Sequence, residues 1–321
     1  MTKQDLRIVF MGTPDFAKMH LEALVDNNYN IAGVFCREDK PKGRGMKMTP
    51  PPVKEYAIEK NIPVYQPNKV KNNPEVMEKL TEWNPNLIIV VAYGRILPKE
   101  ILDYPEYGAI NVHGSILPKY RGAAPIQWSV INGDSETGVT TMYMDEGMDT
   151  GDMITISKVA IEKNDTYEIV HDKLATIGAK TLLLDLERLV ENNGRLDRTK
   201  QPDNFTIAPM LSKDNSRIDF NDTAESICNL IRGTNPFPGA WCKLDEERIY
   251  KIYEAERIDY KVDCEAELGE IVCLNDKKNL FVVRCKDGYI NFLQLKAAGT
   301  RLMTAAEYIR GGKVKVGEQF N

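Results

Sequence analysis

Short apolar runs alternate with amphipathic segments between residues 7 and 190, and this alternation constrains the fold more than any other feature. The apolar runs lie at 7–11, 30–36, 87–91 and 109–112. The segments between them, and a long one at 166–190, have the apolar spacing of helices. Such alternation predicts a Rossmann-like, mostly parallel sheet with helices on both faces.

The pattern changes after residue 190. Residues 195–209 are polar and contain two prolines, and β-rich runs follow at 248–255, 269–273, 280–285 and 289–295. Short strands at near-regular spacing predict a small β-barrel or sandwich, and an OB-like barrel is an attractive form of it. We therefore expect an α/β domain at 1–190, a linker at 191–209 and a C-terminal β-barrel domain at 210–321.

Composition is that of an ordinary globular protein, with 42% hydrophobic and 28% charged residues. No apolar run approaches the roughly 20 residues that span a bilayer, and the first residues have no signal-peptide core. The six cysteines contain no C-x-x-C pair, so reduced, buried thiols are expected rather than a metal site. These features predict a cytoplasmic protein without a membrane partner or a metal.

The net charge of −5 hides two local basic stretches. Residues 37–54 hold six basic side chains against two acidic ones, and residues 271–315 hold nine against three. A phosphate backbone responds to the local field, so an acidic total does not exclude a nucleic-acid partner.

The segment I-N-V-H-G-S-I-L-P begins in a predicted strand and continues into a loop. Asn111 and His113 are two residues apart, so their side chains share one face of that strand. Ligands of open α/β sheets collect at the carboxyl ends of strands, where His113 would lie. The other two histidines, His20 and His171, lie on predicted helices. His113 is therefore the candidate for chemistry, although a histidine that only caps a loop is the simpler alternative.

Asp149 lies in the glycine-flanked sequence M-D-E-G-M-D-T-G-D and can serve as a partner for His113. An ordinary turn is the alternative, since Asp, Gly and Thr are common turn residues. The triplet Asp-Thr-Gly also occurs in aspartic proteases, but those enzymes need two such carboxylates to share a proton. The single triplet of this chain therefore disfavours a protease. Gly12-Thr13-Pro14 lacks the G-x-G-x-x-G fingerprint, which disfavours a nicotinamide dehydrogenase.

With these motifs in view, the chain resembles the methionyl-tRNA formyltransferase family over essentially its whole length. The matching pieces are F-M-G-T-P-D-F-A, K-G-R-G, A-Y-G-R-I-L-P, N-V-H-G-S-I-L-P, R-G-A-A-P-I-Q-W, M-D-T-G-D and N-P-F-P-G-A-W. The Asn-x-His and Asp combination is shared by the wider group of 10-formyltetrahydrofolate-dependent transferases. Gly114 and Ile116 stand where the family often has Ala and Leu.

The resemblance implies formyl transfer from 10-formyltetrahydrofolate to the free amine of initiator methionyl-tRNA, as a step of translation initiation. It assigns catalysis to Asn111, His113 and Asp149, without a metal. It implies a folate-binding segment of Ser115, Ile116, Leu117 and Pro118. It also implies a monomer with a tRNA-binding loop, whose candidate residues are Lys42, Arg44 and Lys47.

Two other functions are weighed against this one. A related formyltransferase could act on a small amine, such as an amino sugar or glycinamide ribotide, but a small amine needs neither the basic loop nor the C-terminal barrel. A non-catalytic RNA-binding module would not need Asn111, His113 and Asp149 together.

Overall fold

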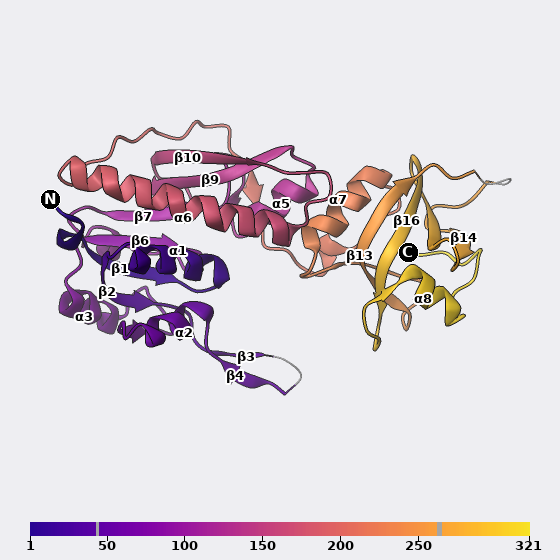
Figure 1. Ribbon diagram of the computed structural model, residues 1–321, viewed down its shortest axis with the longest axis horizontal. Coiled ribbons are helices and arrows are strands. Elements are labelled where there is room, and N and C mark those ends of the chain that lie inside the picture. Colours follow the sequence, from indigo (N-terminus) through magenta and orange to yellow (C-terminus); the bar gives the residue numbers. More distant parts are fainter. Residues whose placement is uncertain (43–44, 262–264) are drawn as a thin grey trace. The chain divides into compact units, whose positions relative to one another are not determined.

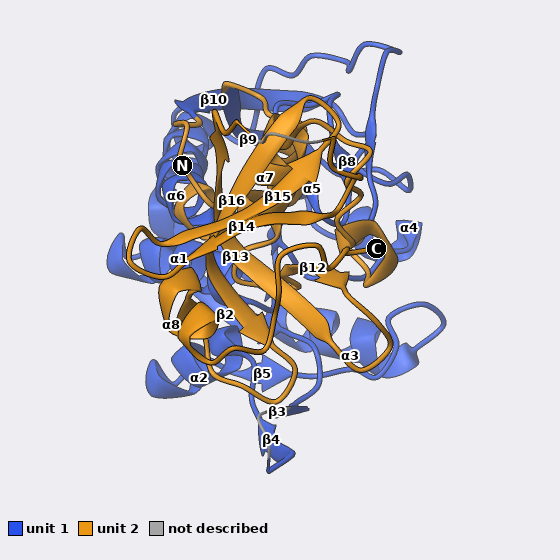
Figure 2. Ribbon diagram, turned by 90° about the vertical axis from the view of Figure 1, so that its right-hand side faces the viewer, with its two compact units in different colours: residues 1–125, 136–160, 171–209 blue, residues 126–135, 161–170, 210–321 orange. Residues whose placement is uncertain are grey.

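The computed structural model describes residues 1–42, 45–261 and 265–321, which form two compact units. Unit 1 comprises residues 1–125, 136–160 and 171–209, and unit 2 comprises residues 126–135, 161–170 and 210–321 (Figure 2).

The sheet of unit 1 has the strand order β10-β9-β7-β6-β1-β2-β5 (Figure 1). The strands from β7 to β5 are mutually parallel, and β9 runs antiparallel to β7 and to β10. Their bounds are β1 (Arg7–Gly12), β2 (Asn30–Phe35), β5 (Val64–Tyr65), β6 (Leu87–Val91), β7 (Ala109–His113), β9 (Glu136–Tyr143) and β10 (Met153–Ala160). The expected mostly parallel sheet is confirmed.

Helices cover both faces of this sheet. On one face, Val9 and Met11 of β1 share a buried cluster with Leu80 and Trp83 of α3. Successive strand residues point to opposite faces, so Phe10 turns to the other side. There it lies beside α1, because a Cβ added to Gly12 would lie 2.6 Å from the ring of Phe10 and 2.7 Å from Ala17 Cβ. The helices in the first 191 residues are η1 (Lys3–Asp5), α1 (Asp15–Asp26), α2 (Pro52–Glu59), α3 (Pro74–Trp83), α4 (Lys99–Leu102), α5 (Pro125–Ile131) and α6 (Tyr167–Glu191).

Two small pairs of strands extend this unit. β3 (Lys40–Lys42) and β4 (Lys47–Thr49) form an antiparallel hairpin. β8 (Arg121–Gly122) pairs in parallel with β11 (Ile207–Ala208). The segment 191–209, expected as a linker, thus contributes a strand to unit 1.

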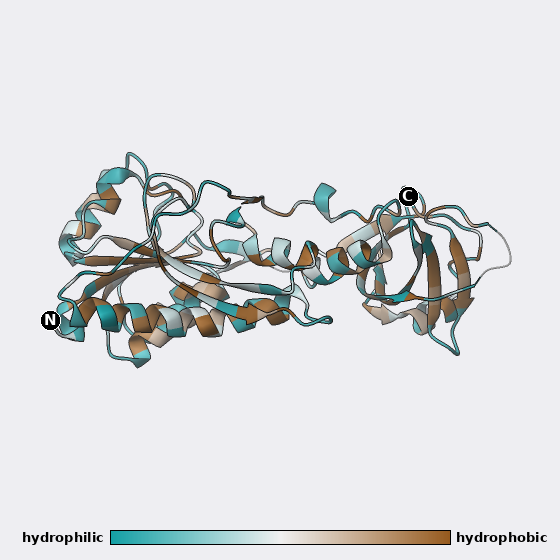
Figure 3. Ribbon diagram, turned by 90° about the horizontal axis from the view of Figure 1, so that it is seen from above, coloured by the Kyte–Doolittle hydropathy of each residue, from teal (hydrophilic) through white to brown (hydrophobic). Residues whose placement is uncertain are grey.

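The C-terminal part of unit 2 is an antiparallel sheet in the order β12-β13-β16-β15-β14, with β17 paired to β16. The β-rich C-terminal domain that the sequence predicts is confirmed. Figure 3 shows the hydrophobic colour along its strands, whose side chains pack in one buried cluster. The elements are η2 (Asp214–Ser216), α7 (Ala224–Thr234), β12 (Ala240–Lys243), β13 (Ile249–Ile258), β14 (Ile271–Asn275), β15 (Leu280–Cys285), β16 (Gly288–Ala297), β17 (Met303–Thr304) and α8 (Ala305–Arg310).

Candidate active site

Asn111 and His113 lie at the carboxyl end of β7, on the sheet face opposite α6. Between them, Val112 points toward α6, because a Cβ added to Gly178 of that helix would lie 3.4 Å from Val112 Cγ1. Strand geometry turns the residues on either side to the other face. Both are largely buried, with 8% of Asn111 and 6% of His113 exposed.

Two acceptors flank the imidazole of His113. Nε2 lies 2.9 Å from the carbonyl oxygen of Tyr120, and a carbonyl only accepts, so this nitrogen donates the proton. Nδ1 faces Asp149, with Oδ1 at 3.6 Å, which is longer than a hydrogen bond. The contact with Tyr120 therefore determines which ring nitrogen faces the carboxylate.

Asp149 reaches His113 from the connection between β9 and β10. Its other carboxylate oxygen, Oδ2, accepts a hydrogen bond of 2.8 Å from the amide of Gly122. Its backbone has φ = +55°, a left-handed conformation that non-glycine residues seldom adopt. Two segments distant in the sequence thus place a carboxylate beside the imidazole.

The side-chain amide of Asn111 is available for a ligand. Within the described ranges, no hydrogen bond of this amide is found. Neither atom of the amide is among the described buried polar atoms that lack a partner, so the amide reaches the surface of the site. Asn111 is therefore a donor that a bound substrate can satisfy.

The segment Ser115 to Pro118 is held by its own polar contacts. Ser115 Oγ donates to the carbonyl of Lys119 at 2.6 Å, and Thr140 Oγ1 donates to the carbonyl of Ser115 at 2.7 Å. Ser115 and Leu117 are buried, whereas Ile116 and Pro118 are partly exposed. Only the last two present side-chain surface to a ligand.

Two of the basic loop candidates, Lys42 and Lys47, belong to the β3–β4 hairpin. Lys42 pairs with Lys47 across the hairpin, and Lys47 is exposed. Arg44 lies outside the described residues. The hairpin also exposes two apolar side chains that the sequence argument left aside, Met46 (67%) and Met48 (58%).

Sequence reasoning missed the residues that hold the imidazole and the carboxylate in place. Tyr120 and Gly122 do so with main-chain atoms, which leave no side-chain signal. Gly122 itself is required, since its φ is +119° and a Cβ there would lie 2.8 Å from the carbonyl oxygen of Ala208. Arg121 belongs to a matching motif but had no assigned role, and Gln201 lies in the segment expected as a linker.

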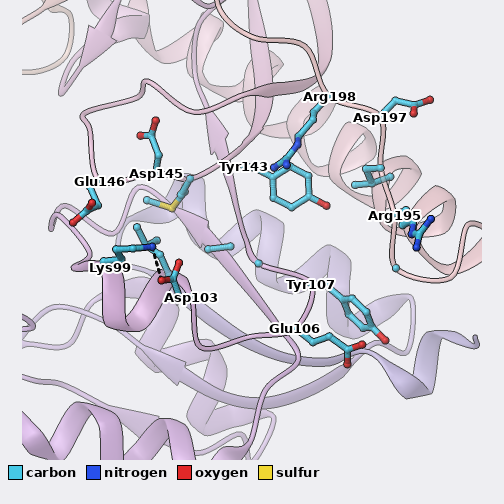
Figure 4. Close-up of a pocket in the computed structure, with 16 residues that line it drawn as sticks. Lys99, Asp103, Glu106, Tyr107, Tyr143, Asp145, Glu146, Arg195, Asp197 and Arg198 are labelled. Carbon is cyan, nitrogen blue, oxygen red and sulfur yellow. Dashed lines mark hydrogen bonds and ion pairs between the residues drawn. The ribbon is translucent and has the colours of Figure 1, made fainter.

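A separate cavity of about 660 Å³ lies elsewhere in unit 1 (Figure 4). Its walls combine charges of both signs with two tyrosines, and Arg198 lies over the ring of Tyr143, 5.3 Å from its centroid. Burial raises the pKa of Tyr143, so this phenol stays neutral. The lining does not include Asn111, His113 or Asp149, and its mixed charge selects no single ligand class.

Neither a metal site nor a disulfide is found in the described ranges. No group of three or more His, Cys, Asp or Glu side chains is arranged to hold a metal there. The cysteines at 36, 228, 242, 273 and 285 are free, and burial raises the pKa of Cys36 to about 12. None of the described helices combines the length and apolarity that crossing a membrane requires.

Two family profiles match the chain: "Formyl transferase" over residues 6–186 and "Formyl transferase, C-terminal domain" over residues 210–313. Curated relatives are similar over nearly the whole chain. The proteins named methionyl-tRNA formyltransferase from Ruminiclostridium cellulolyticum and Clostridioides difficile are each 45% identical, covering 98% and 97% of this chain and 99% of their own lengths.

Solved structures agree in fold. HypX from Aquifex aeolicus in complex with tetrahydrofolic acid is 16% identical, with a TM-score of 0.63 over 98% of this chain and 48% of that one. The sugar 3N-formyl transferase WlaRD is 21% identical, with a TM-score of 0.62 over 92% of this chain and 98% of that one. The chain therefore belongs to the formyl transferase family, and its full-length relatives place it among the methionyl-tRNA formyltransferases.

Proposed function

We propose that this chain transfers the formyl group of 10-formyltetrahydrofolate to the free amine of initiator methionyl-tRNA, which gives N-formylmethionyl-tRNA for translation initiation. The observation that carries the proposal is the grouping of the Asn111 amide, the His113 imidazole and the Asp149 carboxylate at one end of β7, in a chain whose full-length relatives are methionyl-tRNA formyltransferases.

Each of the three side chains has a part in this reaction. The folate supplies the formyl group, and the amine nitrogen forms a bond to the formyl carbon while the folate nitrogen leaves. Asn111 donates its amide to the formyl oxygen as negative charge develops there, and a preorganised donor in a nearly dry site makes this interaction strong. His113 and Asp149 move the proton from the amine toward the leaving nitrogen, and Asp149 keeps the imidazole oriented.

The segment Ser115 to Pro118 forms part of the folate site in this proposal. Ile116 and Pro118 supply apolar surface for the flat ring system. Ser115 and Leu117, which are buried, hold the main chain of the segment in the shape that presents this surface.

The tRNA is bound by the basic hairpin and by the C-terminal half. Lys42, Arg44 and Lys47 contact the acceptor end, where arginine can bond to phosphate in a fork or stack on a base. The basic side chains between residues 277 and 315 contact phosphates and position the tRNA without reading its sequence. Residues 1–190, together with the segment 191–209 that pairs with β8, form the catalytic domain in this assignment, and 210–321 form the tRNA-binding domain.

The protein works as a monomer in the cytoplasm on this proposal. Its free thiols, which include buried Cys36, Cys242 and Cys285, are compatible with a reducing compartment. Size-exclusion chromatography with light scattering tests the monomer directly.

Incubation with 10-formyltetrahydrofolate and charged initiator tRNA, followed by mass measurement of the released aminoacyl group, tests the function. A gain of one formyl group is expected, and His113→Ala should abolish it while tRNA binding persists. Formylation of an amino sugar or of glycinamide ribotide, with methionyl-tRNA left unchanged, would overturn the assignment.

A further inference from the structure

The side chain of Gln201 joins the main chain around Asp149 to Arg121. Its Nε2 donates to the carbonyl oxygens of Asp149 and Gly151, at 2.8 Å each. Its Oε1 accepts from Arg121 Nε at 3.0 Å and from Nη2 at 2.7 Å. Only 5% of Gln201 is exposed, so protein groups rather than water use both ends of the amide.

The main chain that Gln201 binds has a side-chain hydrogen bond within its own loop, from Thr150 Oγ1 to Asp145 Oδ1, and Gln201 adds two from outside the loop. Asp149 has φ = +55°, and a non-glycine residue keeps such a conformation only where its surroundings fix it. Gly151 is equally constrained, because a Cβ there would lie 1.7 Å from the carbonyl oxygen of Tyr143. Two hydrogen bonds from one amide bind the carbonyls on either side of Thr150.

Arg121 sets which end of the amide faces these carbonyls. Its guanidinium is a donor only, so Gln201 must turn its oxygen toward Arg121 and its NH2 group toward Asp149 and Gly151. Arg121 is 8% exposed, and its guanidinium lies 4.6 Å from the centroid of the Phe205 ring.

Tyr120, Arg121 and Gly122 form a tripeptide that contacts both His113 and Asp149. Tyr120 binds His113 through its carbonyl, Gly122 binds Asp149 through its amide, and Arg121 between them holds Gln201. The segment that enters β11 fixes this tripeptide in turn: the amide of Arg121 donates to the carbonyl of Thr206, and β11 pairs with Arg121 and Gly122.

We propose that Gln201, oriented by Arg121, is a positioning residue for formyl transfer, which fixes the backbone around Asp149 and so keeps its carboxylate beside His113. The proposal rests on the proposed function for its kinetic consequence, but the geometric consequence can be measured without turnover. Gln201 touches no reacting atom and acts through Asp149.

Three substitutions and one control test this role. Gln201→Leu removes the hydrogen bonds to Arg121, Asp149 and Gly151. Gln201→Glu keeps the acceptor for Arg121 but turns a carboxylate toward two carbonyls, and Gln201→Asn is a milder change that shortens the side chain. Asn86→Asp is the matched control, because Asn86 also joins two main-chain groups, the amide of Arg7 and the carbonyl of Asp5. These groups lie at the opposite end of the strands from His113.

The first measurement is steady-state kinetics with charged initiator tRNA. Gln201→Leu and Gln201→Glu should lower kcat about tenfold or more, because small misplacements of catalytic groups are costly, while KM for both substrates stays within about threefold. Gln201→Asn should fall between these variants and the native chain. Asn86→Asp should lower the melting temperature but leave kcat unchanged.

The second measurement is the NMR spectrum of the imidazole rings in the folded protein. The chain has three histidines, so substitution of His20 and His171 assigns the signals of His113. The His113 ring signals should move in the Gln201 variants and stay in place in Asn86→Asp. If all variants keep kcat, or if kcat falls while the His113 signals stay in place, the positioning role is overturned. If the native chain does not formylate methionyl-tRNA but the signals move as expected, the proposed function fails and the positioning of Asp149 stands.

Discussion

Asp149 Oδ1 lies 3.6 Å from His113 Nδ1. The two residues come from separate segments, because His113 is the last residue of β7 and Asp149 lies in the connection after β9. The separation leaves the carboxylate close enough to stabilise a charged imidazole but too far for a direct hydrogen bond. The amide of Gly122 holds the other carboxylate oxygen. The pair is thus oriented by main-chain atoms on both sides.

Asp149→Asn should lower kcat on the order of 10³-fold with little change in the fold. Asparagine tolerates the left-handed backbone that Asp149 adopts, but it removes the negative charge that faces the imidazole. Rapid-quench measurement of formyl transfer checks this. The neighbouring Asp152→Asn, whose carboxylate pairs with Arg198, is the control and should keep most activity. Equal losses in both variants would contradict a specific role for Asp149.

Asn111→Ala should lower kcat about 10²–10³-fold while the dissociation constants of both substrates change little, because the amide acts on charge that develops during the reaction. Single-turnover kinetics with enzyme in excess separates the chemical step from binding. A rise in the dissociation constant of the folate that accounts for the whole loss would make Asn111 a binding residue instead.

Arg44→Ala should lower kcat/KM for methionyl-tRNA about tenfold or more, which corresponds to ~1.4 kcal/mol.

Lys47→Ala should weaken tRNA binding at low salt. It should also reduce the slope of log K against log salt by about one, as expected for one lost phosphate contact. Titrations at several salt concentrations measure this slope. Lys79 of α3, which is partly exposed and pairs with Glu82, serves as control in Lys79→Ala. Identical slopes for the native chain, Lys47→Ala and Lys79→Ala would remove the hairpin from the tRNA site.

Most of the sheet was predictable because its strands are apolar runs buried on both faces. β6 is L-I-I-V-V and every residue of it is buried. β9 escaped prediction because its sequence, E-T-G-V-T-T-M-Y, is rich in threonine. Those threonines are buried through polar contacts, such as the hydrogen bond of 2.5 Å from Thr141 Oγ1 to Asp185 Oδ2, which hydropathy does not detect.

The residues of the candidate site also differ in how far the sequence alone can predict them. Asn111 and His113 could be found because strand periodicity puts them on one face. Asp149 was a candidate from its glycine-flanked loop, with an ordinary turn as the alternative, and the family resemblance then assigned it to catalysis. Nothing local marks Gln201, because its partners Asp149, Gly151 and Arg121 lie far away in the sequence. A polar segment with two prolines is typical of a linker, and only its tertiary contacts distinguish it from one.

His20 should make the stability of the protein depend on pH below about 6.5. Its Nδ1 lies 2.7 Å from the carbonyl of Phe16, and within the described ranges Nε2 has no hydrogen-bond partner. The ring is fully buried against α6, where a Cβ on Gly178 would lie 2.7 Å from Nε2. Burial therefore lowers the pKa of His20 to about 4, against an ordinary value of 6.5.

The direction in which the free energy of unfolding changes with pH follows from the number of protons that each state binds. Between pH 6.5 and 4 the unfolded chain takes up a proton at this position and the folded chain does not, so the free energy of unfolding falls as the pH is lowered through this range. The contribution of His20 is complete above pH 6.5, and about 3 kcal/mol of it is lost by pH 4. Urea unfolding at several pH values, compared between the native chain and His20→Gln, measures it: the variant should lose less stability on acidification. His171→Gln controls for the other helical histidine, which contacts the ring of Phe16 from α6 and is partly exposed. If His20→Gln follows the native chain at every pH, the buried ring does not carry this dependence.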